Sequence, residues 1–313
     1  MRVRVVGAGI VGLATAWRMR QSGHEVDIVA AEIGEQTTSA IAAALWMPYR
    51  ALPEREVVRW AARGLDVLST MATDPRTGVD LRTGRVLYRE RTPDPWWAEA
   101  APPLHRLDQA QRPAGFADGI ELTVPVVDTP VHLRWLVDQL ERVGTPVTRR
   151  HVGALEEAAR DVDVVVNCAG LGAGALVGDH DLHPVRGQVL LVEQVGLQSW
   201  VLDETDPVDL TYVVPRRDTI VLGGTALAGD CDDAVRPETA EAILRRAVGL
   251  VPRLAGARVL GHQVGLRPAR SAVRLERDGD VIHCYGHGGA GVTLAYGCAQ
   301  DVDELLSQSR RCS

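Results

Sequence analysis

The chain has 313 residues, of which 34 are basic and 41 acidic, giving a net charge of −7. This length favours about two domains, and the acidic balance without a basic patch argues against a nucleic-acid partner. All basic residues are Arg, so a lysine Schiff base, pyridoxal phosphate chemistry and a P-loop lysine are excluded. No apolar run suits a bilayer span, so no membrane contact is expected. The first residues lead straight into a glycine turn instead of a signal peptide, so a cytoplasmic location is expected.

The cysteines and histidines predict neither a metal site nor a disulfide scaffold. No two cysteines have CxxC spacing, and the nine histidines form no paired-ligand pattern. We expect Cys231 and Cys284 to lie near the same sheet, so a disulfide between them is one possibility and free thiols are the other. The cysteines are Cys168, Cys231, Cys284, Cys298 and Cys312.

The N-terminal segment has the pattern of a dinucleotide-binding βαβ unit. A β-rich run over 2–6 leads into the turn Gly-Ala-Gly-Ile-Val-Gly at 7–12, a helix over 13–21 and a strand over 26–31. The glycines let the backbone approach a pyrophosphate, and the helix start favours its negative charge. Glu32 follows the second strand, in the place of the acid that binds a ribose hydroxyl. The alternative is a plain tight turn between strand and helix.

The next part of the chain mixes regular and irregular predictions. Residues 54–71 predict an amphipathic helix, whereas 74–117 are rich in Pro, Gly and Arg and predict irregular excursions. A strand is expected over 124–127. A helix over 129–143 follows, with Pro130 in its first turn.

Two strand types then follow. Residues 162–170 are an almost continuous apolar run ending in glycine, which is typical of a buried parallel strand. Shorter alternating runs at 188–192, 211–214 and 219–222 favour an antiparallel sheet, and 237–250 predict a helix.

These elements predict an α/β fold with two discontinuous domains. Residues 1–45, 126–186 and 258–313 are assigned to a Rossmann-like cofactor domain. Residues 46–125 and 187–257 are assigned to an α+β substrate domain with a mainly antiparallel sheet.

The stretch from Gly265 to Thr293 carries the strongest indication of a site. Arg267 precedes Pro268, where helix is disfavoured and a bend is expected, and its planar guanidinium fits a carboxylate. A strand over 281–285 then leads into the glycine-rich turn 286–293, a backbone cradle for a flat or anionic ligand. A cofactor and a small carboxylate are therefore expected side by side.

Taken together, the motifs occur in the order seen in D-amino-acid oxidases, and the chain resembles that family over nearly its whole length. The resemblance rests on the N-terminal glycine turn and on residues 37–39, 42–49, 164–170, 212–215, 265–268 and 286–289. It implies tightly but non-covalently bound FAD. It also implies oxidation of D-amino acids to imino acids, which hydrolyse to 2-oxo acids and ammonia while O2 becomes hydrogen peroxide.

The resemblance also implies which residues hold the cofactor. At the pyrophosphate and ribose end these are Gly7, Ala8, Gly9, Ile10, Gly12, Glu32, Thr37, Thr38 and Ser39. Along the flavin ring and at the adenine they are Ala43, Ala44, Leu45, Val152, Cys168, Ala169, Gly170 and Arg267. At the pyrimidine end they are Gly288, Gly289, Ala290, Gly291, Val292 and Thr293.

The implied substrate site needs no protein nucleophile, because the flavin accepts the hydride from Cα. Arg267 and Tyr212 would hold the carboxylate, and the Gly289 carbonyl would accept a hydrogen bond from the amine. The side-chain pocket would be lined by Leu45, Met47, Leu202 and Leu266.

That apolar lining favours neutral apolar D-amino acids. Asp203 and Glu204 would repel a second substrate carboxylate and tolerate a basic side chain, while Arg216 and Arg217 are expected at a solvated strand end. The segment before Tyr212 is short and holds no second tyrosine, which argues against a mobile lid.

Other interpretations stay open at this point. The same fold is compatible with an oxidase of glycine, sarcosine or D-aspartate, and the fingerprint alone with an NAD-dependent dehydrogenase or a non-catalytic flavoprotein sensor. From residue type alone, Tyr212 is more often a packed core residue, Arg267 a surface arginine, and His287 a packing histidine.

Overall fold

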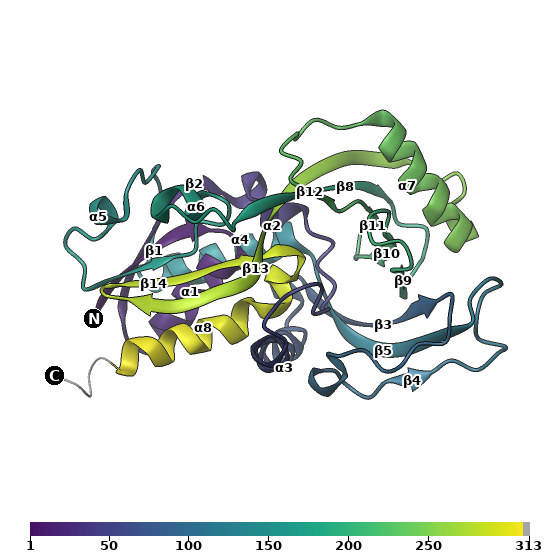
Figure 1. The fold of residues 1–313 in the computed structure, drawn as a ribbon, viewed down its shortest axis with the longest axis horizontal. Helices are drawn as coiled ribbons and strands as arrows, with labels where there is room; N and C mark the ends of the chain where they lie inside the picture. Colours follow the sequence, from purple (N-terminus) through teal and green to yellow (C-terminus); the bar gives the residue numbers. More distant parts are fainter. Residues whose placement is uncertain (309–313) are drawn as a thin grey trace.

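The computed structural model describes residues 1–308, which form a mixed α/β fold around one long sheet (Figure 1). The strands are β1 (Arg2–Ala8), β2 (Glu25–Ile33), β3 (Val79–Tyr88), β4 (His105–Arg106), β5 (Asp118–Val127), β6 (Val147–Arg149), β7 (Val164–Asn167), β8 (His183–Glu193), β9 (Trp200–Asp203), β10 (Thr211–Pro215), β11 (Thr219–Gly223), β12 (Leu227–Ala228), β13 (Val259–Asp278) and β14 (Val281–His287). The α-helices are α1 (Ile10–Gln21), α2 (Thr38–Ile41), α3 (Glu54–Met71), α4 (Thr129–Arg142), α5 (Leu155–Ala158), α6 (Gly172–Val177), α7 (Pro237–Leu250) and α8 (Gly291–Gln308).

One half of the sheet is parallel and confirms the predicted βαβ unit. The strands β14, β7, β1, β2 and β6 lie in that order, and every neighbouring pair among them is parallel. The helix after β1 begins at Ile10, directly after Gly9 and earlier than predicted. Helix α8 packs against both α1 and α3, so this C-terminal helix belongs to the same half of the molecule as β1 and α1 (Figure 1).

The other half is mainly antiparallel, as predicted. Its order is β4, β5, β3, β9, β10, β11 and β8, and only β3 and β9 pair in parallel. Helix α7 packs on β8, β10 and β11 through a second, smaller apolar cluster. The predicted helices over 54–71 and 237–250 match α3 and α7.

The long strands β8 and β13 join the two halves. They pair antiparallel along most of their length, and β13 then pairs with β14 of the parallel half. The sheet therefore runs through both predicted domains without a break, and the domain boundaries stay a prediction. Among residues 1–308, every helix is too short or too polar to serve as a bilayer span.

Two local predictions were wrong. Residues 74–117 are not purely irregular, because they contain β3 and β4; Gly84 interrupts the apolar pattern of β3, and a β-carbon there would collide with Trp200. Arg267 and Pro268 mark no bend, because β13 continues through them and Pro268 stands opposite Pro184. The extended backbone that a residue before proline prefers is also the backbone of a strand.

Candidate active site

The first glycine turn is shaped by close backbone packing. Gly7 has φ +114°, and a β-carbon there would collide with the carbonyl of Cys168. A β-carbon on Gly12 would in turn collide with the carbonyl of Gly7. Only glycine fits these two positions, so the turn, the start of α1 and the Cys168 backbone pack closely together.

Of the three hydroxyl residues at 37–39, Ser39 lies at this helix start. Its Oγ accepts a hydrogen bond from the Ile10 amide at 3.0 Å. The Thr37 hydroxyl donates to the Gly34 carbonyl at 2.7 Å and the Thr38 hydroxyl to the Leu266 carbonyl at 3.3 Å. The structure thus places the Ser39 hydroxyl beside the start of α1, where it could donate a hydrogen bond to a bound pyrophosphate.

The segment predicted to pass the flavin ring is fixed at both ends. The Ala44 carbonyl accepts from the Val127 amide at 3.0 Å, which holds the segment to β5. At the other end, the Thr293 hydroxyl bonds both the amide and the carbonyl of Met47 at 3.0 Å. Residues 43–47 therefore lie between β5 and the start of α8, as a flavin-facing segment requires.

The second glycine turn joins β14 to α8. Gly288 has φ +53°, a left-handed conformation that favours glycine. Gly289 is exposed, whereas Ala290, Val292 and Thr293 are buried beneath it.

The remaining predicted cofactor residues lie at or near the ends of the parallel strands. Glu32 is exposed at the end of β2, and Val152 is buried against Val6 and Val29. Residues 168–170 follow β7 and adjoin Gly7. These positions agree with a dinucleotide running along the carboxyl ends of the parallel strands, and the individual contacts remain predictions.

Arg267 is a cation without an acidic partner. Its Nη1 donates to the Thr225 carbonyl at 2.9 Å, and its guanidinium covers Gly187, where a β-carbon would collide with it. Within residues 1–308 it forms no ion pair with a carboxylate. A half-buried guanidinium with free donors is suited to bind an external carboxylate.

Tyr212 lies beside this guanidinium. In the sheet it stands between Leu202 on β9 and Gly223 on β11, so the three positions share one face. A β-carbon on Gly224 would lie 2.7 Å from the Tyr212 hydroxyl, so the ring needs glycine beneath it. Burial raises the pKa of Tyr212 and the neighbouring Arg267 opposes that shift, which leaves a neutral hydroxyl donor next to the cation.

Tyr49 is a site residue whose role sequence reasoning missed. A β-carbon on Gly289 would lie 2.7 Å from Cδ1 of Tyr49 and 3.6 Å from Cδ of Arg267. The Tyr49 hydroxyl is buried and has no hydrogen-bond partner among residues 1–308. Burial raises the pKa of Tyr49, while Arg50 and Arg267 oppose the shift. The tyrosine was part of the 42–49 motif, but an irregular segment carries no periodicity that would reveal its direction.

The two acids before Tyr212 are directed differently. Asp203 forms an ion pair with Arg89 at 2.9 Å. Glu204 is partly buried and forms no ion pair within residues 1–308; it lies close enough to Tyr49 to raise the pKa of that phenol. Burial raises the pKa of Glu204 itself, and Arg50 opposes this shift. Glu204 therefore lies near Tyr49, whereas Asp203 is paired with Arg89.

These contacts correct one sequence prediction and decide between two open alternatives. Arg216 is not at a solvated strand end: it is 5% exposed, donates to the Ala42 carbonyl at 2.7 Å and pairs with Asp128 at 3.5 Å. It ties Ala42, just before the segment 43–47, to Asp128 at the start of α4. Arg217 is exposed, as predicted. Cys231 is exposed and Cys284 is buried, and both are free thiols, so no disulfide joins them. Cys312 lies outside the described residues.

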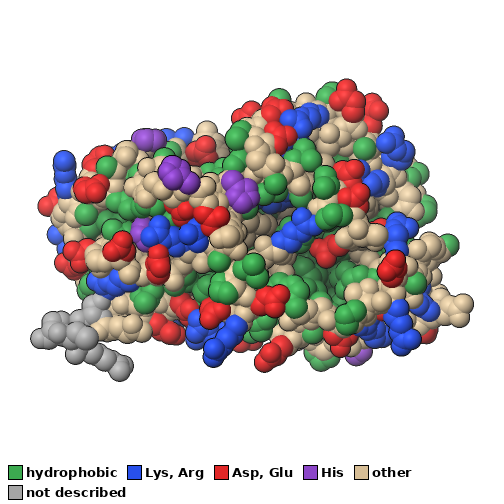
Figure 2. Space-filling view, in the orientation of Figure 1, with side chains coloured by type: hydrophobic (Ala, Val, Ile, Leu, Met, Phe, Trp, Pro, Cys, Tyr) green, Lys and Arg blue, Asp and Glu red, His purple; other side chains and the backbone are tan. Residues whose placement is uncertain are grey.

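The apolar pocket wall is supported in part by the geometry. Met47 and Leu202 are buried, and Leu202 shares the face of Tyr212. Leu266 stands opposite Arg186, and because side chains alternate along a strand, it lies on the face away from Arg267. Figure 2 shows the surface hollowed between strands β9–β11 and strands β3 and β5, with hydrophobic side chains inside the hollow.

Comparisons with known proteins agree with this site. A family described as FAD dependent oxidoreductase matches residues 2–305. A D-amino-acid oxidase from Rubrobacter xylanophilus is 47% identical over 310 residues, covering 97% of this chain and 95% of that protein. One from Streptomyces coelicolor is 44% identical over 312 residues, with 97% and 96% coverage. A glycine oxidase structure from Bacillus cereus superimposes with a TM-score of 0.80 at 19% identity, over 98% of this chain and 95% of that one.

The residues present fit FAD. The two glycine turns, the Ser39 hydroxyl at the start of α1 and the fixed segment 43–47 would hold a dinucleotide with its ring next to Arg267. The family match names FAD and leaves the NAD-dependent alternative without support. With the fold, the glycine turns and full-length relatives in agreement, the chain belongs to the D-amino-acid oxidase family of FAD-dependent oxidoreductases.

Proposed function

We propose that this protein oxidises D-amino acids to 2-oxo acids and ammonia and that O2 is reduced to hydrogen peroxide. The observation that carries the proposal is Arg267, a cation without a carboxylate partner in residues 1–308, beside the hydroxyl of Tyr212 and beneath Gly289. Bound FAD supplies the hydride acceptor for this chemistry.

The protein's part is to bind and orient the substrate. Arg267 binds the carboxylate through two charge-assisted hydrogen bonds, and Tyr212 adds a neutral donor. The Gly289 carbonyl accepts a hydrogen bond from the amine. With the carboxylate and amine fixed, one enantiomer presents its Cα hydrogen to the cofactor and the other presents its side chain. The buried Tyr212 stays protonated and is a binder, so no side chain acts as a base.

The preferred side chains are neutral and apolar. Leu202 and Met47 are buried near Tyr212, and burying each CH2 of a substrate against such a surface contributes about 0.8 kcal/mol. Glu204 makes substrates with basic side chains the next best after apolar ones, and it disfavours substrates whose side chain carries a carboxylate.

The alternative of a D-aspartate-type oxidase is favoured by one observation. The Arg50 guanidinium lies 5.0 Å from the centre of the Tyr49 ring and is exposed, so it is the cation available to a second carboxylate. Values of kcat/KM for D-valine, D-phenylalanine, D-arginine and D-aspartate separate the two. A lead for D-aspartate would assign Arg50 to the pocket.

Peroxide release tests the reaction itself. The purified yellow protein should release peroxide with D-alanine and none with L-alanine. No peroxide release with either enantiomer would favour a non-catalytic sensor. A cytoplasmic location is part of the same proposal, supported by Cys231, which is exposed and free and persists in a reducing compartment. Fractionation of the source cells would check it.

A further inference from the structure

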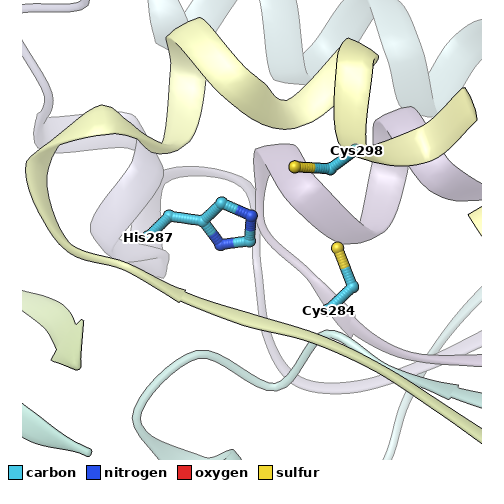
Figure 3. Close-up of side chains that lie close together, drawn as sticks. All are labelled: Cys284, His287 and Cys298. Carbon is cyan, nitrogen blue, oxygen red and sulfur yellow. The ribbon is translucent and has the colours of Figure 1, made fainter. Parts of the chain in front are cut away.

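Three soft donor groups meet in the interior beneath the second glycine turn. Cys284 lies in β14, His287 ends that strand, and Cys298 lies on the facing helix α8. Cys284 and Cys298 are 0% exposed and His287 is 3% exposed. Figure 3 shows the imidazole edge of His287 turned toward the two sulfur atoms.

The donor atoms of these residues form a compact triangle. One ligand atom from each lies within 4.8 Å of the other two. A point therefore exists that is no more than about 2.8 Å from each of the three atoms, which is about 0.5–0.8 Å beyond typical zinc–sulfur and zinc–nitrogen bonds. A small inward movement of the side chains would therefore complete a coordination sphere.

His287 provides a second, independent observation. Its Nε2 is buried and has no hydrogen-bond partner among residues 1–308. A buried polar atom without a partner is destabilising, and a metal ion bound to this nitrogen would satisfy it. Burial also lowers the pKa of His287 to about 4, so the imidazole is neutral and its lone pair is available to a metal.

We propose that Cys284, His287 and Cys298 bind one thiophilic metal ion with a filled d shell, either Zn²⁺ or Cu⁺. Each thiol releases its proton to solvent as it becomes a thiolate ligand. Two thiolates and a neutral imidazole around a divalent ion make a neutral group, which a dry interior accepts. Cys168 adjoins Cys284 and offers a fourth sulfur to Zn²⁺, whereas Cu⁺ is satisfied with three donors.

The position of the site indicates what the ion does. The ion would link β14 to α8 directly below Gly288 and Gly289, the turn assigned to the pyrimidine end of FAD. We infer a structural role, because the site is buried and the Cys168 sulfur can fill the fourth position of a tetrahedral Zn²⁺, which leaves no position for a substrate. Binding to the folded state alone raises the thermal midpoint.

Metal content of the FAD-loaded protein tests the proposal. The reduced protein is incubated anaerobically with ZnSO4 or with a Cu⁺ salt, desalted and analysed by elemental mass spectrometry. Cys298→Ser removes one ligand. Cys231→Ser removes an exposed thiol outside the cluster and is the matched control.

We expect about one ion per chain in the wild type and in Cys231→Ser, and at least a fivefold lower content in Cys298→Ser. The thermal midpoint of the wild type should rise by roughly 5 °C with the bound ion. Wild-type protein that retains neither metal, or Cys298→Ser that retains as much as wild type, overturns the proposal. If Cys298→Ser does not fold, the wild-type stoichiometry and midpoint shift decide, with Cys231→Ser excluding the exposed thiol. None of these readings depends on enzymatic activity.

Discussion

Gly289 and Tyr49 are packed so closely that a β-carbon on the glycine would lie 2.7 Å from Cδ1 of the tyrosine. Carbon atoms that are not bonded do not approach this closely, so any side chain at 289 displaces Tyr49. The same β-carbon would lie 3.6 Å from Cδ of Arg267. The proposed cofactor cradle and the proposed substrate carboxylate site therefore meet at one glycine.

Gly289→Ala should lower kcat/KM for D-alanine by roughly ten- to a hundredfold, because overpacking costs about 1–3 kcal/mol and falls on Tyr49 and Arg267. Gly249→Ala is the control, since nothing lies within 4 Å of a β-carbon there and the residue is on α7, outside the site. Steady-state kinetics with both variants check this. Equal kinetics for Gly289→Ala and Gly249→Ala would contradict the placement of Tyr49.

Tyr212→Phe should cost about tenfold in kcat/KM at most, because it removes one neutral hydrogen bond worth about 0.5–1.5 kcal/mol. Since burial raises the pKa of Tyr212, the hydroxyl stays protonated at and below the ordinary phenol value, and the pH–rate profile of the variant should match wild type up to about pH 9. Loss of several thousandfold, or of a limb of the profile, would mean that the hydroxyl transfers a proton.

Glu204→Gln should change the ranking of substrates more than the overall rate. Removing the acid that we propose to face the substrate should lower kcat/KM for D-arginine and raise it for D-aspartate, each by roughly five- to tenfold, because a charge interaction near a protein surface is worth about 1 kcal/mol or more. D-Valine should change little. Glu241→Gln, which removes an exposed charge from α7, is the control. An unchanged ratio of D-arginine to D-aspartate would place Glu204 away from the substrate.

His132 should make the protein less stable in acid. Its ring is fully buried, bonds the Thr77 carbonyl at 2.7 Å and the Tyr296 hydroxyl at 2.5 Å, and burial lowers its pKa to about 4. As pH falls below about 6.5, this histidine takes up a proton in the unfolded chain but stays neutral in the folded chain. The free energy of unfolding therefore decreases between about pH 6.5 and pH 4. A depression of this size corresponds to roughly 3 kcal/mol.

Thermal midpoints at pH 7.5 and pH 5 measure this loss. The drop should be smaller in His132→Gln than in wild type, and His105→Gln, at an exposed position, should keep the wild-type drop. The same drop in all three proteins would assign the acid sensitivity to other groups.

Much of the fold could be predicted because its helices and strands follow from local sequence patterns. The βαβ unit follows from alternating apolar residues and glycines, and helices over 54–71 and 237–250 follow from their apolar faces. The site required more, since Tyr49 approaches Arg267, and Glu204 approaches Tyr49, only through long-range packing. Arg216 was predicted at the surface because charged residues are usually exposed. It is buried instead, because it forms an ion pair with Asp128 and a hydrogen bond with the Ala42 carbonyl.

The cysteine and histidine cluster shows the same limit. The sequence indicated no metal site, because Cys284 and His287 are separated from Cys298 by a turn and lack ligand spacing. Only the packing of α8 on β14 brings the three donors together. Spacing rules detect sites built on one local element, and this cluster is built across two.

Anaerobic reduction of the flavin tests the central claim, that Arg267 anchors the carboxylate of a D-amino acid. D-Alanine should bleach the yellow absorbance of the wild type, and L-alanine should not. In Arg267→Leu the bleaching rate at low substrate should fall by about two to three orders of magnitude, because losing one partner of a desolvated charge pair costs about 3–5 kcal/mol. Flavin content should stay near wild type, and Arg258→Leu, whose guanidinium is exposed, should behave as wild type. Equal bleaching by both enantiomers, or an Arg267→Leu protein with unchanged KM, would contradict the account.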